Sequence, residues 1–380
     1  MRAFACSSLL LALASAPAAR AELPSGRGVL LPLQDRVGVS ELTELAETLL
    51  RRELETQADL AETETVRAVL RSMRVRDASN EPPDRLAAVA ERLGADWFFI
   101  ATLHEAKAGR EPRREDGGPL EGSQFDDAGD TPQLVISARV LRSHSPKLWW
   151  AGFDGASGRD GEWAFGLGKI ESLAELMRGV VSGIVEAAVE TREPRRRTRL
   201  RSGKGGYLRS PGGPDPPETV AVIPMDSVAD LDPGASAEVA TAALYAALED
   251  FGFKTLLPGF VRAIREDTGP IQHGGASRAE WQALASEGEA DWVATGTVET
   301  YLRGHGRTPS PRVAFSVRFL DAGDGRIGWS HGGDLAGEDT AAVFDRGRIY
   351  STGDLTYEMM RSLLGDLRAG AKTAGTTRRD

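Results

Sequence analysis

One short pattern in the sequence has the residue types that nucleophilic catalysis needs. Gly328-Trp329-Ser330-His331-Gly332 spells G-x-S-x-G, the nucleophile elbow of many hydrolases. That elbow requires the serine on a strained turn from a strand into a helix, with an acid and a histidine elsewhere. The residues that follow, 333–337, do not predict a helix, and the matching segment 149–152 has no serine. We therefore expect no enzyme, and a hydrolase that uses Ser330 is the least favoured interpretation.

The sequence also lacks the residue patterns that are typical of metal sites and of phosphate-binding loops. The histidines form neither an i, i+4 pair nor an H-x-E arrangement, so zinc ligation is not indicated; they are His104, His144, His273, His305 and His331. Asp321 and Asp324 lack the spacing of a calcium loop and suit a hairpin turn. Gly203-Lys204 lacks the strand, the spaced glycine and the Ser/Thr of a phosphate loop. We expect no metal and no cofactor.

The first residues, 1–21, are typical of a signal peptide. Arg2 precedes a short apolar run at 9–14, and Ala19-Arg20-Ala21 forms an A-x-A cleavage site. The one cysteine, Cys6, lies before most of the apolar run, which disfavours a lipid anchor on it. The sequence thus predicts a periplasmic or otherwise exported protein, and association with the outer membrane is compatible with it.

Composition narrows the classes of partner. The formal net charge is −10, and it becomes more negative once Arg2 and Arg20 leave with the signal peptide. An acidic chain does not favour binding to nucleic acid or to anionic lipid. After the leader, no segment is apolar enough to predict a transmembrane helix.

The elements that would position any site occur twice. VAERLGADWFFIATLH at 89–104 is matched by LASEGEADWVATGTVET at 284–300, and the distance from Trp97 to Trp292 recurs from Arg67 to Arg262. This indicates one α/β module used twice, at 28–190 and 219–369. Between the modules lies a basic Gly/Pro-rich linker, 191–218, which is either a solvated spacer or a strap on an anionic surface. Residues 370–380 are predicted to be a disordered tail.

Apolar periodicity gives the order of elements inside each module. In the first, a buried strand at 28–33 precedes an amphipathic helix, a second helix that stops at Gly94, and a strand from Trp97. A polar loop at 107–132 separates that strand from an alternating one at 134–141, and a further strand and a helix follow. The second module repeats this order, with a capping box at Ser277 and Glu280. The predicted fold class is mixed α/β: two tandem βαβαβββα-like modules, each a mixed sheet with helices mainly on one face.

Four segments of the second module resemble a known envelope domain. They are VAVIPM, TLLPGFV, ADWVATGTV and VRFLDAGDGRIGWS. Together they resemble the α/β domain of the TolB amino-terminal domain and of CsgG-type and LpoB-type proteins, over most of 219–369 and more weakly over 28–190. The resemblance implies a sheet packed by helices on one side, in proteins that work by binding other proteins. Propeller repeats, an anchor cysteine and pore-forming hairpins of those families have no counterpart here.

Matching polar residues mark a candidate partner-binding surface. Ser137 and Arg139 lie on the strand face opposite its apolar residues, and Ser316 and Arg318 occupy the same positions in the second module. If helices cover one side of each sheet, these residues remain accessible, and arginine is enriched where proteins meet. The alternatives are that the arginines pair with local acidic residues, or that the two open faces pack on each other.

These observations favour an exported, non-catalytic accessory or scaffold protein that binds another envelope component. The alternative is a structural subunit that assembles with itself into an envelope or secretion complex. No residue pattern identifies the partner, because protein-binding surfaces carry no spacing rule comparable to that of a metal site.

Overall fold

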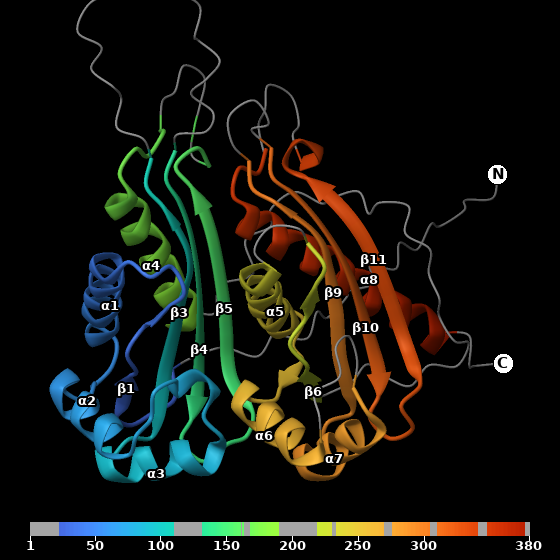
Figure 1. Ribbon diagram of the computed structural model, residues 1–380, viewed down its shortest axis with the longest axis horizontal. Coiled ribbons are helices and arrows are strands. Elements are labelled where there is room, and N and C mark those ends of the chain that lie inside the picture. The colour runs from blue at the N-terminus through green and yellow to red at the C-terminus, as the bar shows by residue number, and fades with distance from the viewer. Residues whose placement is uncertain are drawn as a thin grey trace, which may run out of the picture.

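The computed structural model describes residues 23–109, 131–160, 162, 168–189, 219–229, 233–269, 276–304, 310–340 and 348–376 (Figure 1). Two mixed sheets, each with its own helices, confirm the predicted α/β fold of two modules. The predicted signal peptide 1–21, the linker 191–218 and most of the loop at 107–132 lie outside the described residues.

The first module has a five-stranded sheet with the order β1-β3-β4-β5, and β2 pairs with β3. Only β1 and β2 run parallel to β3, because a helical crossover separates them from it in the chain. Its elements are β1 (Gly28–Leu30), β2 (Gln34–Asp35), α1 (Ser40–Glu55), α2 (Thr63–Ser72), η1 (Ala78–Asn80), α3 (Pro83–Leu93), β3 (Trp97–Lys107), β4 (Gln133–Arg142), β5 (Leu148–Ser157) and α4 (Leu173–Val189).

The second module has a six-stranded sheet with the order β11-β10-β9-β6-β8, and β7 pairs with β9. Its elements are β6 (Thr219–Val222), β7 (Asp226–Ser227), α5 (Pro233–Asp250), β8 (Lys254–Thr255), α6 (Pro258–Thr268), α7 (Arg278–Gly288), β9 (Trp292–Leu302), β10 (Arg312–Asp321), β11 (Ile327–Ala336), η4 (Gly337–Thr340) and α8 (Thr352–Thr376). The capping box of Ser277 and Glu280 is present at the start of α7, as predicted.

The strand pairings of the two sheets correspond residue by residue. Arg139 lies opposite Ile100 and Ala151, and Arg318 lies opposite Thr295 and Ser330. Each long central strand also has a bulge at the equivalent place, at His104 in β3 and at Glu299 in β9. A bulge adds one unpaired residue to a strand and so shifts the alternation of the residues that follow it. The two modules can therefore be compared position by position.

Within each module, two helices cover one face of the sheet. α1 and α4 bury the side of β3 and β4 that carries Phe99 and Ile136. Helices α5 and α8 do the same for the second sheet, over Phe315 and Phe319. The shorter helices α2 and α3, and α6 and α7, pack at one end of the opposite faces (Figure 1).

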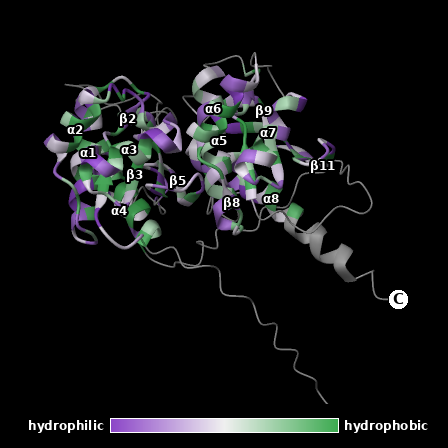
Figure 2. Cartoon of the chain, turned by 90° about the horizontal axis from the view of Figure 1, so that it is seen from below, coloured by the Kyte–Doolittle hydropathy of each residue, from purple (hydrophilic) through white to green (hydrophobic). Residues whose placement is uncertain are grey.

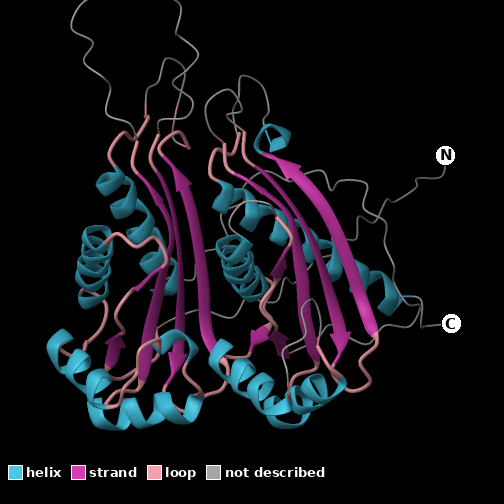
Figure 3. Cartoon of the chain, viewed as in Figure 1, coloured by secondary structure: helices cyan, strands magenta, loops and turns pink. Residues whose placement is uncertain are grey.

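The two modules are stacked in the same orientation, so that α5 and α8 contact both sheets. Besides their own strands β9, β10 and β11, these helices pack on β5 of the first module. The layers therefore follow in the order α1 with α4, first sheet, α5 with α8, second sheet (Figure 3). Apolar residues fill the interior of both modules, which lie side by side when viewed from below (Figure 2).

Several contacts fix this stacking. Arg36 forms a 3.0 Å ion pair with Glu238 of α5, and the Tyr301 hydroxyl donates to the buried Glu105 carboxylate at 2.8 Å. At the lower edge, the backbone N–H of Leu257 donates to the carbonyl of Pro146 at 2.8 Å. One apolar core continues across the boundary between the modules.

Two features differ from the sequence prediction. Each module contains one helix more than expected, α2 and α6, and both are short amphipathic helices whose buried pairs are Val66 with Leu70 and Val261 with Ile264. Helix α8 continues through Thr376, into the segment 370–380 that we expected to be a disordered tail. Extending an existing helix needs no new nucleus, and Ala371, Lys372 and Ala374 are residues that favour a helix. Residues 377–380 lie outside the described part of the chain.

Candidate functional site

The four residues predicted to bind a partner lie at equivalent positions but in different surroundings. Ser137 is buried and Arg139 half-buried, on the face of the first sheet that meets α5. Ser316 and Arg318 are both half-buried on the matching face of the second sheet. Apart from α6 and α7 at one end, no helix of the described residues packs on this second face. We call it the open face, defined by Thr295, Thr297, Ser316, Arg318, Ser330 and Gly332.

The face of the first sheet is closed by direct packing from the second module. Phe153 stacks on Tyr357 of α8, with ring centroids 5.8 Å apart. A Cβ added to Gly155 would overlap the backbone of Gly353 and Asp354. The glycine is therefore required for the close approach of the α8 N-terminus. The face of the first sheet that carries Arg139 does not pack on the open face of the second sheet, which was one alternative from the sequence. Helices α5 and α8 of the second module cover it instead.

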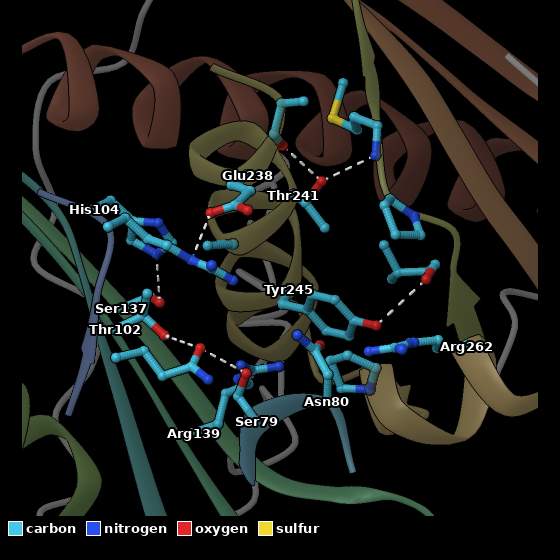
Figure 4. A pocket seen from close by; sticks show the side chains of 18 of the residues that line it. Ser79, Asn80, Thr102, His104, Ser137, Arg139, Glu238, Thr241, Tyr245 and Arg262 are labelled. Carbon is cyan, nitrogen blue, oxygen red and sulfur yellow. Dashed lines mark hydrogen bonds and ion pairs between the residues drawn. The ribbon is translucent and has the colours of Figure 1, made fainter. Parts of the chain in front are cut away.

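A cavity of about 360 Å³ remains where α5 crosses the first sheet (Figure 4). The first module contributes side chains from β2, η1, β3 and β4, and the second contributes residues of α5, α6 and the segment after β6. We call it the intermodule cavity, and its main polar lining residues are Arg36, Thr102, His104, Ser137, Arg139, Glu238, Thr241, Tyr245 and Arg262.

His104 lines this cavity as a neutral, buried imidazole. It lies on the same face of β3 as Ile100 and Thr102, and its Nε2 lies 2.8 Å from Ser137 Oγ. Burial, aided by the positive charges of Arg139 and Arg36, lowers the pKa of His104 to about 3. Its Nδ1 is buried and has no hydrogen-bond partner within the described part of the chain. A neutral histidine offers one donor and one acceptor, so one capacity of this ring is unused.

Four arginines line the intermodule cavity, and three of them are paired. Arg36 contacts Glu238 at 3.0 Å and Arg262 contacts Glu266 at 2.7 Å, whereas Arg265 pairs with the buried Glu280. Arg139 has no ion-pair partner in any of the described ranges, although Tyr245 and Asp77 act on it electrostatically. Burial lowers the pKa of Arg139, but a guanidinium stays protonated at neutral pH.

The open face of the second sheet has a more polar composition. Thr295, Ser330 and Gly332 stand where the first sheet has Ile100, Ala151 and Phe153. At its edge, Arg312 and Asp334 form a 2.8 Å ion pair between two exposed side chains. Hydroxyls and charges on adjacent strands offer donors and acceptors to a partner, with little apolar area.

The motifs that suggested catalysis or metal binding have structural positions. Ser330 lies inside β11, half-buried and within a regular antiparallel pairing, and not on a turn from a strand into a helix. Among the described residues, no group of three or more His, Cys, Asp or Glu side chains could hold a metal ion. The tryptophans Trp97, Trp150, Trp292 and Trp329 are buried in the cores.

Two features of the site were not found from the sequence. One is the role of His104, because the sequence does not show that the second module covers this face of β3. The other is the covering of the first sheet by α5, although a signal exists: α5 has buried residues around most of its circumference, including Tyr245 and Ala246. A helix that is apolar on all sides is one that packs on two surfaces.

Comparison with known proteins gives structural neighbours only. No family model and no curated protein sequence matches the chain. The PelC L103M dodecamer from Paraburkholderia phytofirmans is similar at 16% identity and a TM-score of 0.29, over 43% of this chain and 96% of that one. Lipoprotein GNA1162 from Neisseria meningitidis is 18% identical with a TM-score of 0.27, over 43% and 100%. The LpoB C-terminal domain from Salmonella enterica is 16% identical with a TM-score of 0.24, over 33% and 86%.

The last of these neighbours is of the LpoB type that the sequence resembles. At these identities and TM-scores, the similarity does not assign the chain to a family.

Proposed function

We propose that the chain is an exported, non-catalytic protein that binds another protein of the cell envelope through the open face of its second sheet. One observation carries this proposal. The face that α5 and α8 cover in the first module has an equivalent in the second module over which the described chain places helices only at one end. A sheet face of this kind is a surface on which a second protein can pack.

The polar composition of the open face is typical of a surface that binds a partner reversibly. Ser316, Thr297 and Ser330 bring hydroxyls from three adjacent strands to one surface, and Arg318 lies among them. Arginine is enriched in protein interfaces, whereas a permanent interface would be more apolar. We therefore infer an accessory or scaffold role with an exchangeable partner.

Export rests on the sequence of residues 1–21, which the structure does not describe. In the described residues, no helix is both long and apolar enough to cross a membrane. Cleavage after Ala21 is the expected processing step, and mass spectrometry of the exported protein tests it. Retention of Met1, or a lipid on Cys6, would contradict it.

A charge-reversal pair tests the binding surface. Arg318→Glu changes the centre of the open face, and Arg326→Glu makes the same change on the hairpin turn, where that side chain is 87% exposed. Both tagged variants and the wild type are exported, cross-linked in cells and purified. We expect Arg318→Glu to lose the cross-linked partner and Arg326→Glu to retain it, with equal melting temperatures. Equal recovery by all three proteins would refute the assignment.

Self-association is the second candidate, because the packing of α5 and α8 on the first sheet is a head-to-tail contact that another copy could repeat. Light scattering of the purified protein distinguishes the two. A monomer that still captures a partner supports the first proposal. A concentration-dependent assembly that Arg318→Glu dissolves would replace it with the second.

A further inference from the structure

The intermodule cavity contains a positive charge without a counterion. Arg36, Arg262 and Arg265 each have a carboxylate, in Glu238, Glu266 and Glu280. No carboxylate oxygen of the described residues lies within 4.0 Å of the Arg139 guanidinium. Asp77 acts on it from farther away, and the oxygens of Asp77 accept from Ser79 and Asn80.

A half-buried charge without a counterion between two packed modules needs an explanation. Removing an ion from water costs several kcal/mol unless an opposite charge and hydrogen bonds compensate it. The equivalent Arg318 is also half-buried, but it lies on the open face and not between two modules. Arg139 instead lies in a cavity between two packed modules. A bound anion would supply the missing charge.

The remaining lining indicates what kind of anion fits. Part of the wall on the side of the second module is apolar and consists of Val222, Pro224, Met225, Ala237 and Ala242, beside the polar side chains of Glu238, Thr241, Tyr245 and Arg262. Opposite them lie Arg139 and His104, whose buried Nδ1 lacks a partner among the described residues. The volume of about 360 Å³ is within the range of small-molecule sites. A cation without a counterion, together with an apolar stretch of wall, matches a molecule with a charged head and a hydrocarbon part.

We propose that the intermodule cavity binds a small amphiphilic anion, whose carboxylate or phosphate head pairs with Arg139 and whose hydrocarbon part packs on the Met225 and Ala242 side. The site is separate from the open face and does not depend on the partner proposed there. Because residues of both modules line it, an occupied cavity would also strengthen the contact between them.

Calorimetry with three probes of equal chain length tests the ligand class. The mature chain is titrated with decanoate, decyl phosphate and decanol. We expect at least one anion to bind in a saturable way, and decanol to bind roughly 10- to 100-fold more weakly, because it lacks the charge-assisted bond. The two anions show which head group the site prefers. No saturable binding of either anion, or equal binding of decanol, would overturn the proposal.

Matched arginine variants assign the binding to this cavity. Arg139→Met should weaken the preferred anion roughly 10- to 100-fold, Arg139→Lys should weaken it less, and Arg318→Met should not change it. Melting curves show whether each variant is folded. We expect Arg139→Met to keep or raise the melting temperature, because the substitution removes an unbalanced charge. Ala242→Phe fills the apolar side without touching the charge and should also abolish binding. Equal affinity of wild type and Arg139→Met would show that the anion binds elsewhere.

Discussion

The two sheets have the same strand pairings and the same Ser-x-Arg pattern. Among the described residues, helices cover the face that carries this pattern along its length only in the first sheet. In the first module, Ile100 and Phe153 lie under α5 and α8; in the second, Thr295 and Gly332 occupy those positions. The arginines are shared, and the residues around them differ. The neighbours of a polar residue, and not the residue itself, therefore decide whether a repeated sheet face is buried or left open.

The bulged positions show the same divergence. The bulges at His104 and Glu299 interrupt the regular alternation at equivalent places, yet His104 is buried and Glu299 is exposed. A buried neutral histidine is compatible with the packing of α5, whereas a buried glutamate would need a counterion. Exchanging residues between equivalent positions should therefore harm the first module more than the second.

The largest effect is expected from exchanging the residues at one pair of equivalent positions, Gly155 in the first sheet and Asp334 in the second. Gly155→Asp places a side chain and a charge against the α8 backbone at Gly353 and Asp354, and should cost about 4 kcal/mol or more of unfolding free energy. The reciprocal Asp334→Gly loses an exposed ion pair with Arg312 and should cost about 1 kcal/mol. Urea denaturation measures both. Similar losses for the two variants would contradict the difference between the faces.

A somewhat smaller effect is expected at the aromatic contact. Phe153→Ala removes the ring that stacks on Tyr357 and leaves a void between the modules, so we expect a loss of roughly 3 kcal/mol. Gly332→Ala, at the equivalent position of the open face, should change stability by less than about 1 kcal/mol. Thermal unfolding of the two variants compares them, and an unchanged midpoint for Phe153→Ala would show that this contact does not hold the modules together.

Lowering the pH should reduce the stability of the folded protein, because His104 is buried as a neutral imidazole. The folded protein keeps this imidazole neutral down to a pKa of about 3, whereas the unfolded chain takes up the proton near 6.5. Stability therefore falls as the pH decreases from 6.5 toward 3, by about 1.4 kcal/mol at pH 5.5. His104→Gln should remove this part of the pH dependence, and Glu299→Gln at the exposed equivalent should not. A slope that survives in His104→Gln would place its origin in other groups.

The smallest effect is expected from cutting the chain between the modules. A protease site within 191–218 should leave elution volume and melting temperature nearly unchanged, because contacts such as Arg36 with Glu238 and Tyr301 with Glu105 join the two parts without the linker. Size-exclusion chromatography after cleavage measures this. Two separately eluting halves would show that the modules fold and function as independent domains.

Much of the fold follows from the sequence because each strand and helix carries its own periodicity. The alternation at 134–141 predicts Ser137 and Arg139 on one strand face, and in the structure both residues lie on the same face of β4. The layer order does not follow, since it depends on a contact between segments far apart in the chain. The candidate site was therefore only half predictable: the arginines could be located from the sequence, but the cavity around Arg139 needs α5 from the other module.

The most direct test of the difference between the faces compares cysteines at the two equivalent serines. In a Cys6→Ser background, Ser137→Cys and Ser316→Cys are each treated with a maleimide, in purified protein and in envelope fractions. The account predicts that purified Ser316→Cys reacts at least about tenfold faster than Ser137→Cys, and that its reaction slows in the envelope, where a partner covers it. Equal rates for the two cysteines, or a Ser316→Cys rate that the envelope leaves unchanged, would contradict it.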